Sequence, residues 1–277
     1  LGLFEPCWSW LAPAAMAALA GGLSRRLPPP CSCQEKGDLH WFRIQDDAGD
    51  VKLLLRMEGG PLGLKVSVDG LPPVLLATPS RPVPVLGGVI SGSCMAALGL
   101  LLASHRLHGP ILEIGAGRGL LGFLAAAALG CPAKVTDLEE EVCNALRHSL
   151  QASPEFGSHL DVAVEMLDWD DGLETATGQL TRVSAQPGLL LGADLLWADD
   201  AIDSLYEAAK EVVGAGWTFV YGASERPSNL AFRRRLEATP ATCLDTAKYR
   251  VLKVCAECQG WQTSEDCSVL VWRSELA

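Results

Sequence analysis

One segment constrains the fold of this chain more than any other, the glycine-rich run at residues 113–119, which reads Glu-Ile-Gly-Ala-Gly-Arg-Gly. A short apolar stretch at 111–114 predicts a buried strand before it, and an apolar stretch at 120–129 predicts a helix after it. Glycines let a backbone turn sharply and approach a ligand where a Cβ would collide. In an open α/β sheet, ligands bind at such strand-to-helix turns. The run therefore predicts an α/β fold with a ligand site here.

Strands and helices alternate through the rest of the chain after residue 88. Besides the two segments above, the patterns predict strands at 134–136, 162–166, 189–192, 218–221 and 268–272, and helices at 95–104, 139–151, 201–213 and 229–237. Parallel strands need crossover connections, which such helices supply. The alternation predicts a parallel sheet that is covered by helices on both faces.

The first 80 residues are organised differently. Short β-like runs at 41–45, 51–57, 64–68 and 74–77, separated by turn residues such as Asp69-Gly70, predict a small antiparallel β extension over residues 39–80. Residues 1–38 are rich in Pro, Gly and Ala and lack a period, so we expect a leader that is disordered or processed. Because the chain starts at Leu1 rather than Met, we expect the natural N-terminus to be missing.

Two uncharged stretches raise the question of a membrane span. Residues 8–20 are too few for a helix that crosses a bilayer, which needs about 20 residues. Residues 82–104 are numerous enough, but prolines and glycines such as Pro84, Gly88 and Gly92 interrupt them. We expect a buried strand or loop followed by a buried helix, and no membrane span.

The charge balance excludes several classes of protein. Lys and Arg number 22 against 33 Asp and Glu, which gives a net charge of −11, and the hydrophobic content is 49%. That hydrophobicity excludes an intrinsically disordered chain. Nonspecific affinity for nucleic acids comes mainly from basic contacts to phosphates. We therefore expect no nucleic-acid partner and favour a basic protein or a small molecule.

The ten cysteines are scattered along the chain. Cys255 and Cys258 form a lone C-x-x-C pair, whereas a zinc site needs a second pair at suitable spacing. We therefore expect no metal site, and free thiols in a reducing compartment, cytoplasmic or nuclear. Organellar targeting by residues 1–38 stays open as the alternative.

Two acidic residues flank the glycine run. Glu113 lies two positions before Gly115, and Asp137 ends the next predicted strand, twenty residues after Gly117. An acidic side chain there accepts hydrogen bonds from ribose hydroxyls, while Glu113 suits a cationic amino-acid end. Dinucleotide sites carry GxGxxG instead, so the GxGxG spacing favours S-adenosylmethionine over NAD. Taken singly, each residue has an ordinary alternative: Glu113 as a loop charge and Asp137 as a helix N-cap.

Several segments, in order, resemble the class I methyltransferases with a seven-stranded Rossmann-like sheet, and more closely the family-16 protein-lysine methyltransferases. The similarity extends over about residues 86–240, and its clearest parts are 111–122, 135–140, Leu-Asp-Trp at 167–169 and Leu-Gly-Ala-Asp-Leu-Leu-Trp at 191–197. The resemblance implies an S-adenosylmethionine-dependent N-methyltransferase that acts on a lysine side chain of a protein. The methyltransferase domain would cover residues 81–277.

The resemblance also implies roles for individual residues. Those expected to bind the cofactor are Glu113, Gly115, Ala116, Gly117, Gly119, Asp137, Leu138, Asp168, Trp169 and Ala193. Trp169 would stack beside the adenine, with an ordinary core tryptophan as the alternative. Asp194 and Trp197 would be catalytic, the carboxylate orienting the amine and the ring favouring its cationic head.

Three positions depart from the family pattern: Trp197 replaces a tyrosine, Ser91 a tryptophan and His148 an asparagine. The aromatic face survives at Trp197, but the hydroxyl is lost. Two alternatives therefore stay open. One is a methyltransferase for protein arginine, another side chain or a small molecule, and the other is a catalytically weak protein that binds the donor and acts through interactions.

Overall fold

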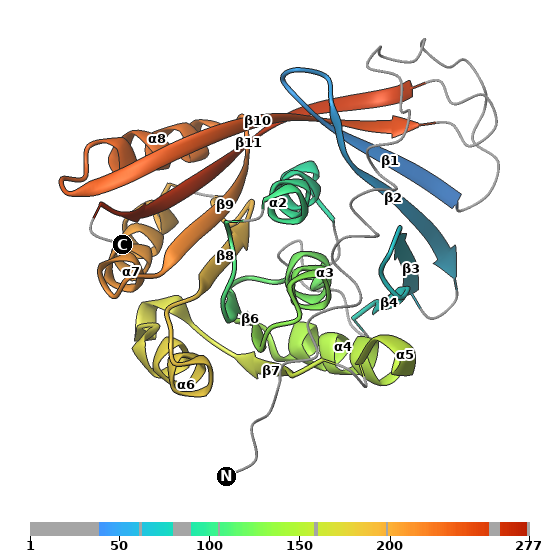
Figure 1. Ribbon diagram of the computed structural model, residues 1–277, viewed down its shortest axis with the longest axis horizontal. Coiled ribbons are helices and arrows are strands. Elements are labelled where there is room, and N and C mark those ends of the chain that lie inside the picture. Colours follow the sequence, from blue (N-terminus) through green and yellow to red (C-terminus); the bar gives the residue numbers. More distant parts are fainter. Residues whose placement is uncertain are drawn as a thin grey trace.

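The computed structural model describes residues 39–60, 63–79, 90–104, 106–157, 160–197, 199–254 and 261–275. The expected leader at 1–38, the domain boundary at residues 80 and 81 and the C-x-x-C pair lie outside the described residues. In the described part, all strands join into one sheet of eleven (Figure 1).

Seven strands form the part of the sheet that the resemblance predicts. They are β5 (Ile111–Glu113), β6 (Ala133–Asp137), β7 (Val162–Met166), β8 (Leu189–Ala193), β9 (Thr218–Ser224), β10 (Thr242–Val254) and β11 (Trp261–Ser274). Their spatial order is β10-β11-β9-β8-β5-β6-β7. The α/β class and the seven-stranded Rossmann-like sheet are confirmed.

The prediction of a wholly parallel sheet is wrong. Strands β9, β8, β5, β6 and β7 are parallel to one another, whereas β11 pairs antiparallel with both β9 and β10. Strand β10 was also missed, because its polar and apolar residues do not form a continuous buried run. Its place depends on pairing with β11, which no local pattern records.

Four further strands confirm the predicted antiparallel extension: β1 (Leu39–Asp46), β2 (Val51–Gly60), β3 (Gly63–Val68) and β4 (Val74–Ala77). The Asp69-Gly70 turn connects β3 to β4, with Gly70 in the left-handed region at φ 83°. The extension continues the main sheet, because β1 pairs antiparallel with β10. Strands β10 and β11, at 13 and 14 residues, are long enough to carry β1 beyond the central sheet.

Helices lie on both faces of the sheet, as predicted. Their bounds are α2 (Gly92–Ala103), α3 (Leu120–Leu129), α4 (Glu140–Gln151), α5 (Pro154–Gly157), α6 (Glu174–Ser184), α7 (Ala201–Gly214) and α8 (Pro227–Glu237), with a 3₁₀ turn η1 (Trp169–Asp171). Helices α2 and α3 lie inside the curve of the sheet, and α6, α7 and α8 lie outside it (Figure 1). The sequence patterns did not predict the short elements α5 and η1 or the longer helix α6.

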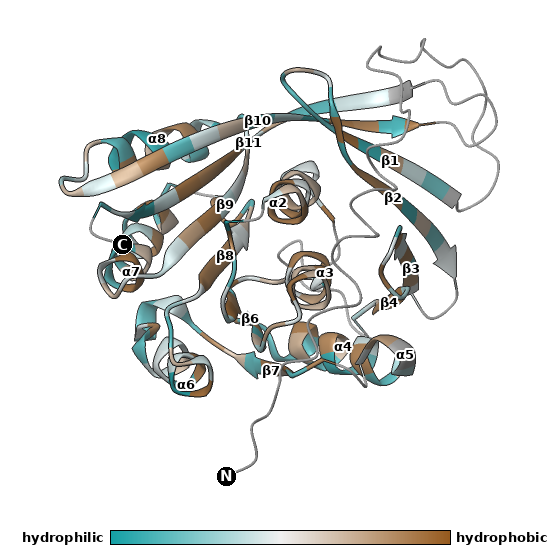
Figure 2. Cartoon of the chain, in the orientation of Figure 1, coloured by the Kyte–Doolittle hydropathy of each residue, from teal (hydrophilic) through white to brown (hydrophobic). Residues whose placement is uncertain are grey.

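The two faces of the sheet bury separate hydrophobic cores. Along β8, Leu189 and Leu191 belong to the core shared with α2 and α3, while Leu190 belongs to the core on the other face. This follows from the two-residue period of a strand, and it explains why these strands appear as continuous apolar runs. Figure 2 shows the same concentration of hydrophobic residues on α2 and α3.

The second uncharged stretch contains helix α2, whose residues are mostly buried. The predicted buried helix is confirmed, with bounds a few residues earlier than expected, and residues 82–89 lie outside the described part. Within the described residues, no helix combines the length and the apolar character needed to cross a membrane.

Candidate functional site

The turn after β5 is built by glycines with positive φ. Gly115, Gly117 and Gly119 have φ values of 57°, 54° and 75°, which other residues adopt only with strain. The Ala116 amide donates to the Thr136 carbonyl at 2.9 Å, and the Gly119 amide donates to the Ala116 carbonyl at 2.8 Å. The loop is thereby held against the end of β6, with α3 starting directly after it.

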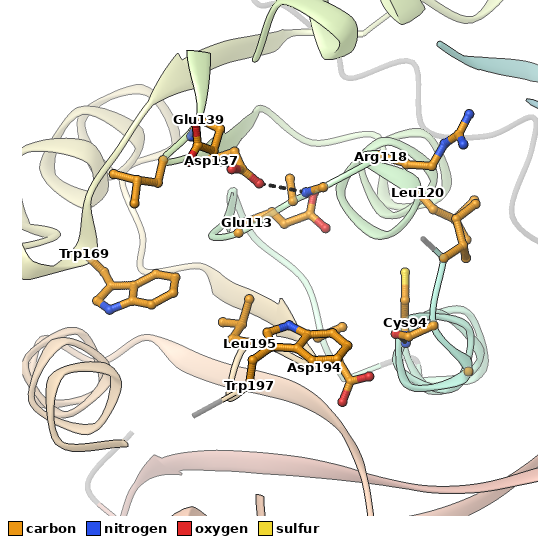
Figure 3. Close-up of a pocket in the computed structure, with 18 of the residues that line it drawn as sticks. Cys94, Glu113, Arg118, Leu120, Asp137, Glu139, Trp169, Asp194, Leu195 and Trp197 are labelled. Atoms are coloured by element: carbon orange, nitrogen blue, oxygen red, sulfur yellow. Dashed lines mark hydrogen bonds between the residues drawn. The ribbon is translucent and has the colours of Figure 1, made fainter. Parts of the chain in front are cut away.

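A cavity of about 420 Å³ opens beside this turn, at the carboxyl ends of the parallel strands (Figure 3). The predicted site residues that line it are Glu113, Gly115, Ala116, Gly117, Asp137, Leu138, Trp169, Ala193, Asp194 and Trp197. A volume of this size suits a small-molecule ligand. The structure therefore brings most of the predicted site together in one place.

Two predicted residues lie outside the cavity lining. Gly119 faces the core, where an added Cβ would collide with the Leu146 and Phe123 side chains, and it is the N-cap of α3. The Asp168 carboxylate accepts a hydrogen bond from the Asp170 amide at 3.0 Å and so caps the 3₁₀ turn. Each residue shapes the local backbone beside the cavity, and its role in cofactor binding stays a prediction.

Glu113 is almost fully buried, with 3% of its surface exposed. Its carboxylate accepts a hydrogen bond from the Gly122 amide, 3.0 Å away in the first turn of α3. Burial raises the pKa of Glu113 to about 8, the Gly122 hydrogen bond opposes the rise, and the nearby Asp137 charge adds to it. A cation that enters the cavity would favour the ionised Glu113 carboxylate and so lower this pKa.

Asp137 is bonded to the glycine loop. Its Oδ2 accepts a hydrogen bond from the Gly117 amide at 2.9 Å, and its Oδ1 accepts one from the Glu139 amide at 3.1 Å (Figure 3). The N-cap of α4 is Glu139, so the helix-cap alternative for Asp137 is wrong. Its carboxylate lies at the edge of the cavity, where a ribose hydroxyl would find an acceptor.

Trp169 lies between a hydrophobic core and the cavity and contributes to both. Its Nε1 donates to the Ser204 hydroxyl at 2.8 Å, and the ring packs against the core on the outer face of the sheet. The ring also lines the cavity, and a Cβ added at Gly115 would lie 3.6 Å from its Cζ3 atom. A flat ring held in this way offers a surface on which a base can stack.

The residue after β8, Asp194, has a strained backbone. Its φ is 57°, a region that non-glycine residues visit rarely and that clusters at functional sites. The side chain is 4% exposed. Its Oδ1 accepts a hydrogen bond from the Ser224 hydroxyl at 2.6 Å, and its Oδ2 lies 3.3 Å from the Arg226 Nη2.

Arg226 joins the two residues predicted to be catalytic. Its guanidinium carbon lies 3.8 Å from the centroid of the Trp197 ring, while its Nη2 pairs with Asp194. Sequence analysis missed Arg226, although it follows β9, the parallel strand next to β8, whose carboxyl end faces the same edge of the sheet. Cys94 of α2 and Glu265 of β11 also line the cavity without having been predicted, as do the apolar residues Ile90, Leu120 and Leu195.

The residues present fit S-adenosylmethionine. Gly115 and Gly117 line the cavity without side chains, the Glu113 and Asp137 carboxylates suit the ammonium and the ribose, and Trp169 offers a flat face. Among the residues that the structure describes, no group of three or more His, Cys, Asp or Glu is placed to hold a metal ion.

Comparisons with known proteins agree with this arrangement. The lysine methyltransferase family matches residues 96–237, just over half of the chain. Comparison with curated protein sequences gives no significant match.

Comparison with solved structures gives matches at low sequence identity, and three of them are described here. Precorrin-6y C5,15-methyltransferase of Geobacter metallireducens is 14% identical, with a TM-score of 0.48 over 69% of this chain and 97% of its own. The Methanobacterium thermoautotrophicum precorrin 8w decarboxylase is 14% identical, with a TM-score of 0.46 over 71% and 95%. Human methyltransferase 10 domain containing protein is 10% identical, with a TM-score of 0.44 over 72% and 89%.

The family match covers the glycine loop, both flanking carboxylates and the strained Asp194. The chain belongs to the lysine methyltransferase family, within the class I methyltransferases that use S-adenosylmethionine as methyl donor.

Proposed function

We propose that this protein transfers the methyl group of S-adenosylmethionine to the side-chain nitrogen of lysine in a protein substrate. The match to the lysine methyltransferase family favours lysine as the acceptor, and one observation supports a subsite for a cationic side chain. The Asp194 carboxylate and the Trp197 ring, at the rim of the donor cavity, already hold a cationic group, the guanidinium of Arg226. A carboxylate beside an aromatic face is the surrounding that an alkylammonium group prefers.

The residues of the chain divide the work of binding and orientation. When bound, the donor supplies a methyl group activated by a sulfonium. The glycine turn, Glu113 and Asp137 bind the amino-acid and ribose ends, and Trp169 supports the adenine. A lysine must lose its proton before it attacks, and Asp194 accepts a hydrogen bond from the amine and so directs the nitrogen lone pair. Holding two reactants in line supplies much of the acceleration of such a transfer.

The partner and the compartment are part of the same proposal. A net charge of −11 would attract a basic protein over long range. The cysteines among the described residues are free thiols, which supports a cytoplasmic or nuclear location. Imaging of the tagged full-length protein tests the location, and a secreted or organellar signal would contradict it.

The test of the function is incubation of the purified protein with isotope-labelled donor and cell extract, followed by site mapping by mass spectrometry. We expect labelled methyl groups on lysine. A Gly117→Arg variant places a long side chain in the donor cavity and serves as the inactive control. Label on arginine, on another side chain or on a small molecule would contradict the lysine assignment. Donor binding with no labelled product from any extract would favour the interaction protein.

A further inference from the structure

Arg226 is the residue whose position the donor site does not explain. It lines the cavity together with Asp194 and Trp197, and its side chain is 35% exposed. Its guanidinium fills the space between the carboxylate and the ring, where the proposed function requires the amine of a substrate lysine. We propose that Arg226 occupies the acceptor-amine subsite in the absence of substrate, and that a lysine must displace it, so that Arg226 sets the affinity for the acceptor.

The Arg226 guanidinium and the ammonium group of a substrate lysine cannot occupy this subsite together. Arg226 Nη2 lies 3.3 Å from Asp194 Oδ2, and its guanidinium carbon lies 3.8 Å from the centroid of the Trp197 ring. An ammonium that uses the same oxygen and the same ring face would lie within van der Waals distance of the guanidinium. Two cations at such a distance repel each other. Amine binding therefore requires that the Arg226 side chain leaves.

One of the two terminal nitrogens of the Arg226 guanidinium is poorly accommodated. Among the described residues, its buried Nη1 atom has no hydrogen-bond partner, and a buried donor without a partner disfavours the conformation that contains it. Trp197 is 46% exposed, so the cage opens to solvent on one side. A cation that fits this subsite better can therefore displace the Arg226 guanidinium.

The backbone at Arg226 is held by hydrogen bonds that do not depend on its side chain. The Arg226 amide donates to the Ser224 carbonyl at 2.8 Å, and the Arg226 carbonyl accepts from the Leu230 amide at 3.0 Å in the first turn of α8. Asp194 also keeps the Ser224 hydroxyl at 2.6 Å and the Asn229 amide at 3.4 Å. Displacement therefore empties the subsite without releasing the carboxylate that receives the amine.

The experiment measures amine binding without turnover, and it rests on the proposed function only for the choice of probe. The full chain is saturated with S-adenosylhomocysteine and titrated with n-butylamine, which has the same end as a lysine side chain. Arg226→Met removes the charge and keeps the aliphatic stem. We expect it to bind the amine about 3- to 30-fold more tightly than the wild type, because an internal competitor is lost.

Arg233→Met is the matched control, because Arg233 lies on α8, the helix that Arg226 caps, and pairs only with Glu237 among the contacts described. This control should bind the amine as the wild type does, and Arg226→Lys should stay within about threefold of it, because a cation remains. Unchanged or weaker binding by a folded Arg226→Met protein would overturn the proposal.

A measurement on the wild type avoids any folding defect of the variants. The NMR resonance of the Arg226 side-chain Nε–H group should be shifted by the Trp197 ring, and saturation with the amine should return it to the position of an exposed arginine. A resonance that does not move would overturn the proposal. Tighter amine binding by Arg226→Met together with no labelled lysine in any extract would uphold this role of Arg226 and reject the lysine activity.

Discussion

At the scale of the residue, three carboxylates in one cavity have different environments. Asp137 is held by backbone amides of the glycine loop and of its own strand end. Asp194 is held by Ser224 and Arg226. Glu113 is buried and accepts a hydrogen bond from one amide, that of Gly122, and burial raises its pKa to about 8. Three similar side chains in one cavity thus differ in their hydrogen-bond partners.

Replacing Asp194 by Asn tests the orienting role. Asn tolerates the left-handed backbone at φ 57° better than Ala does, so the fold should persist while the charge is lost. We expect kcat for methyl transfer to fall about 100-fold or more, because the Asn oxygen is an uncharged and weaker acceptor than a carboxylate. The dissociation constant of the donor, measured by calorimetry, should change less than about threefold. Full residual activity would remove Asp194 from the mechanism.

The raised pKa of Glu113 predicts how donor binding depends on pH. The cationic donor binds best to the ionised carboxylate, so the affinity should increase with pH until the pKa of about 8 is passed and then level off. Glu113→Gln should lose this component, and the difference between the two profiles separates it from titration of the donor's own amine. Parallel profiles for the two proteins would show that Glu113 does not titrate with binding.

The same shift contributes to folding with the opposite sign. The folded protein holds the Glu113 proton up to a pH of about 8, whereas the unfolded chain releases it near the ordinary value of 4.5. Between these values the unfolded state binds fewer protons, so this group lowers the free energy of unfolding as the pH rises. At neutral pH, burial of Glu113 therefore lowers the free energy of unfolding, and the same carboxyl group is the one expected to bind a cation.

At the scale of the element, helix α4 protects the outer edge of β4. The amides of Leu75 and Ala77 donate to the hydroxyls of Ser153 and Ser149, both at 2.8 Å. An edge strand with free amides invites pairing with other chains. Here Ser149 of α4 and Ser153, in the link between α4 and α5, take the place of a neighbouring strand. Helix α4 also contacts β7 at the opposite end of the sheet, so one helix spans both edges.

Ser149→Ala tests this cover. The Ser149 side chain is buried, at 1% exposure, and its loss leaves the Ala77 amide buried without an acceptor. We expect the free energy of unfolding to fall by about 1–3 kcal/mol, measured by urea denaturation. Ser184→Ala is the matched control, because the Ser184 hydroxyl bonds only to backbone groups within four residues of it, at the end of α6, among the contacts described. An equal effect of both substitutions would contradict the assigned role.

At the scale of the whole molecule, the N-terminal strands are part of the main fold. Arg118, in the glycine loop, donates through Nη2 to the Leu76 carbonyl of β4 at 2.8 Å, which links the extension to the donor cavity. Ile44 and Leu53 are buried against α2, where a Cβ added at Gly99 would lie 3.1 Å from Ile44 Cγ2. The sheet therefore encloses α2 from both the central strands and the extension.

Deleting residues 1–80 should consequently prevent stable folding. The truncated chain would expose the edge of β10 and the face of α2 that the extension covers, and burial of large aliphatic side chains stabilises by about 1.5–3 kcal/mol each. We expect an aggregated product, or a protein without a cooperative thermal transition by circular dichroism. Deleting only residues 1–38 is the control for loss of chain length. A truncated protein that unfolds cooperatively and binds the donor would show that the extension is dispensable.

The sequence by itself determined the local features of this protein. The strand, glycine turn and helix at 111–129, the hairpin at Asp69-Gly70 and the spacing of Glu113, Asp137 and Asp194 depend on backbone preferences and periodicity within short windows. Such windows contain the physical information that decides them.

Only the tertiary structure decided which distant segments meet. It inserted β11 between β9 and β10, joined the extension to β10, and left Gly119 and Asp168 out of the cavity lining. It also brought Arg226 onto Asp194 and Trp197. These outcomes depend on strand pairing and side-chain packing between residues far apart in the chain, and that free energy exists only once the sheet has formed.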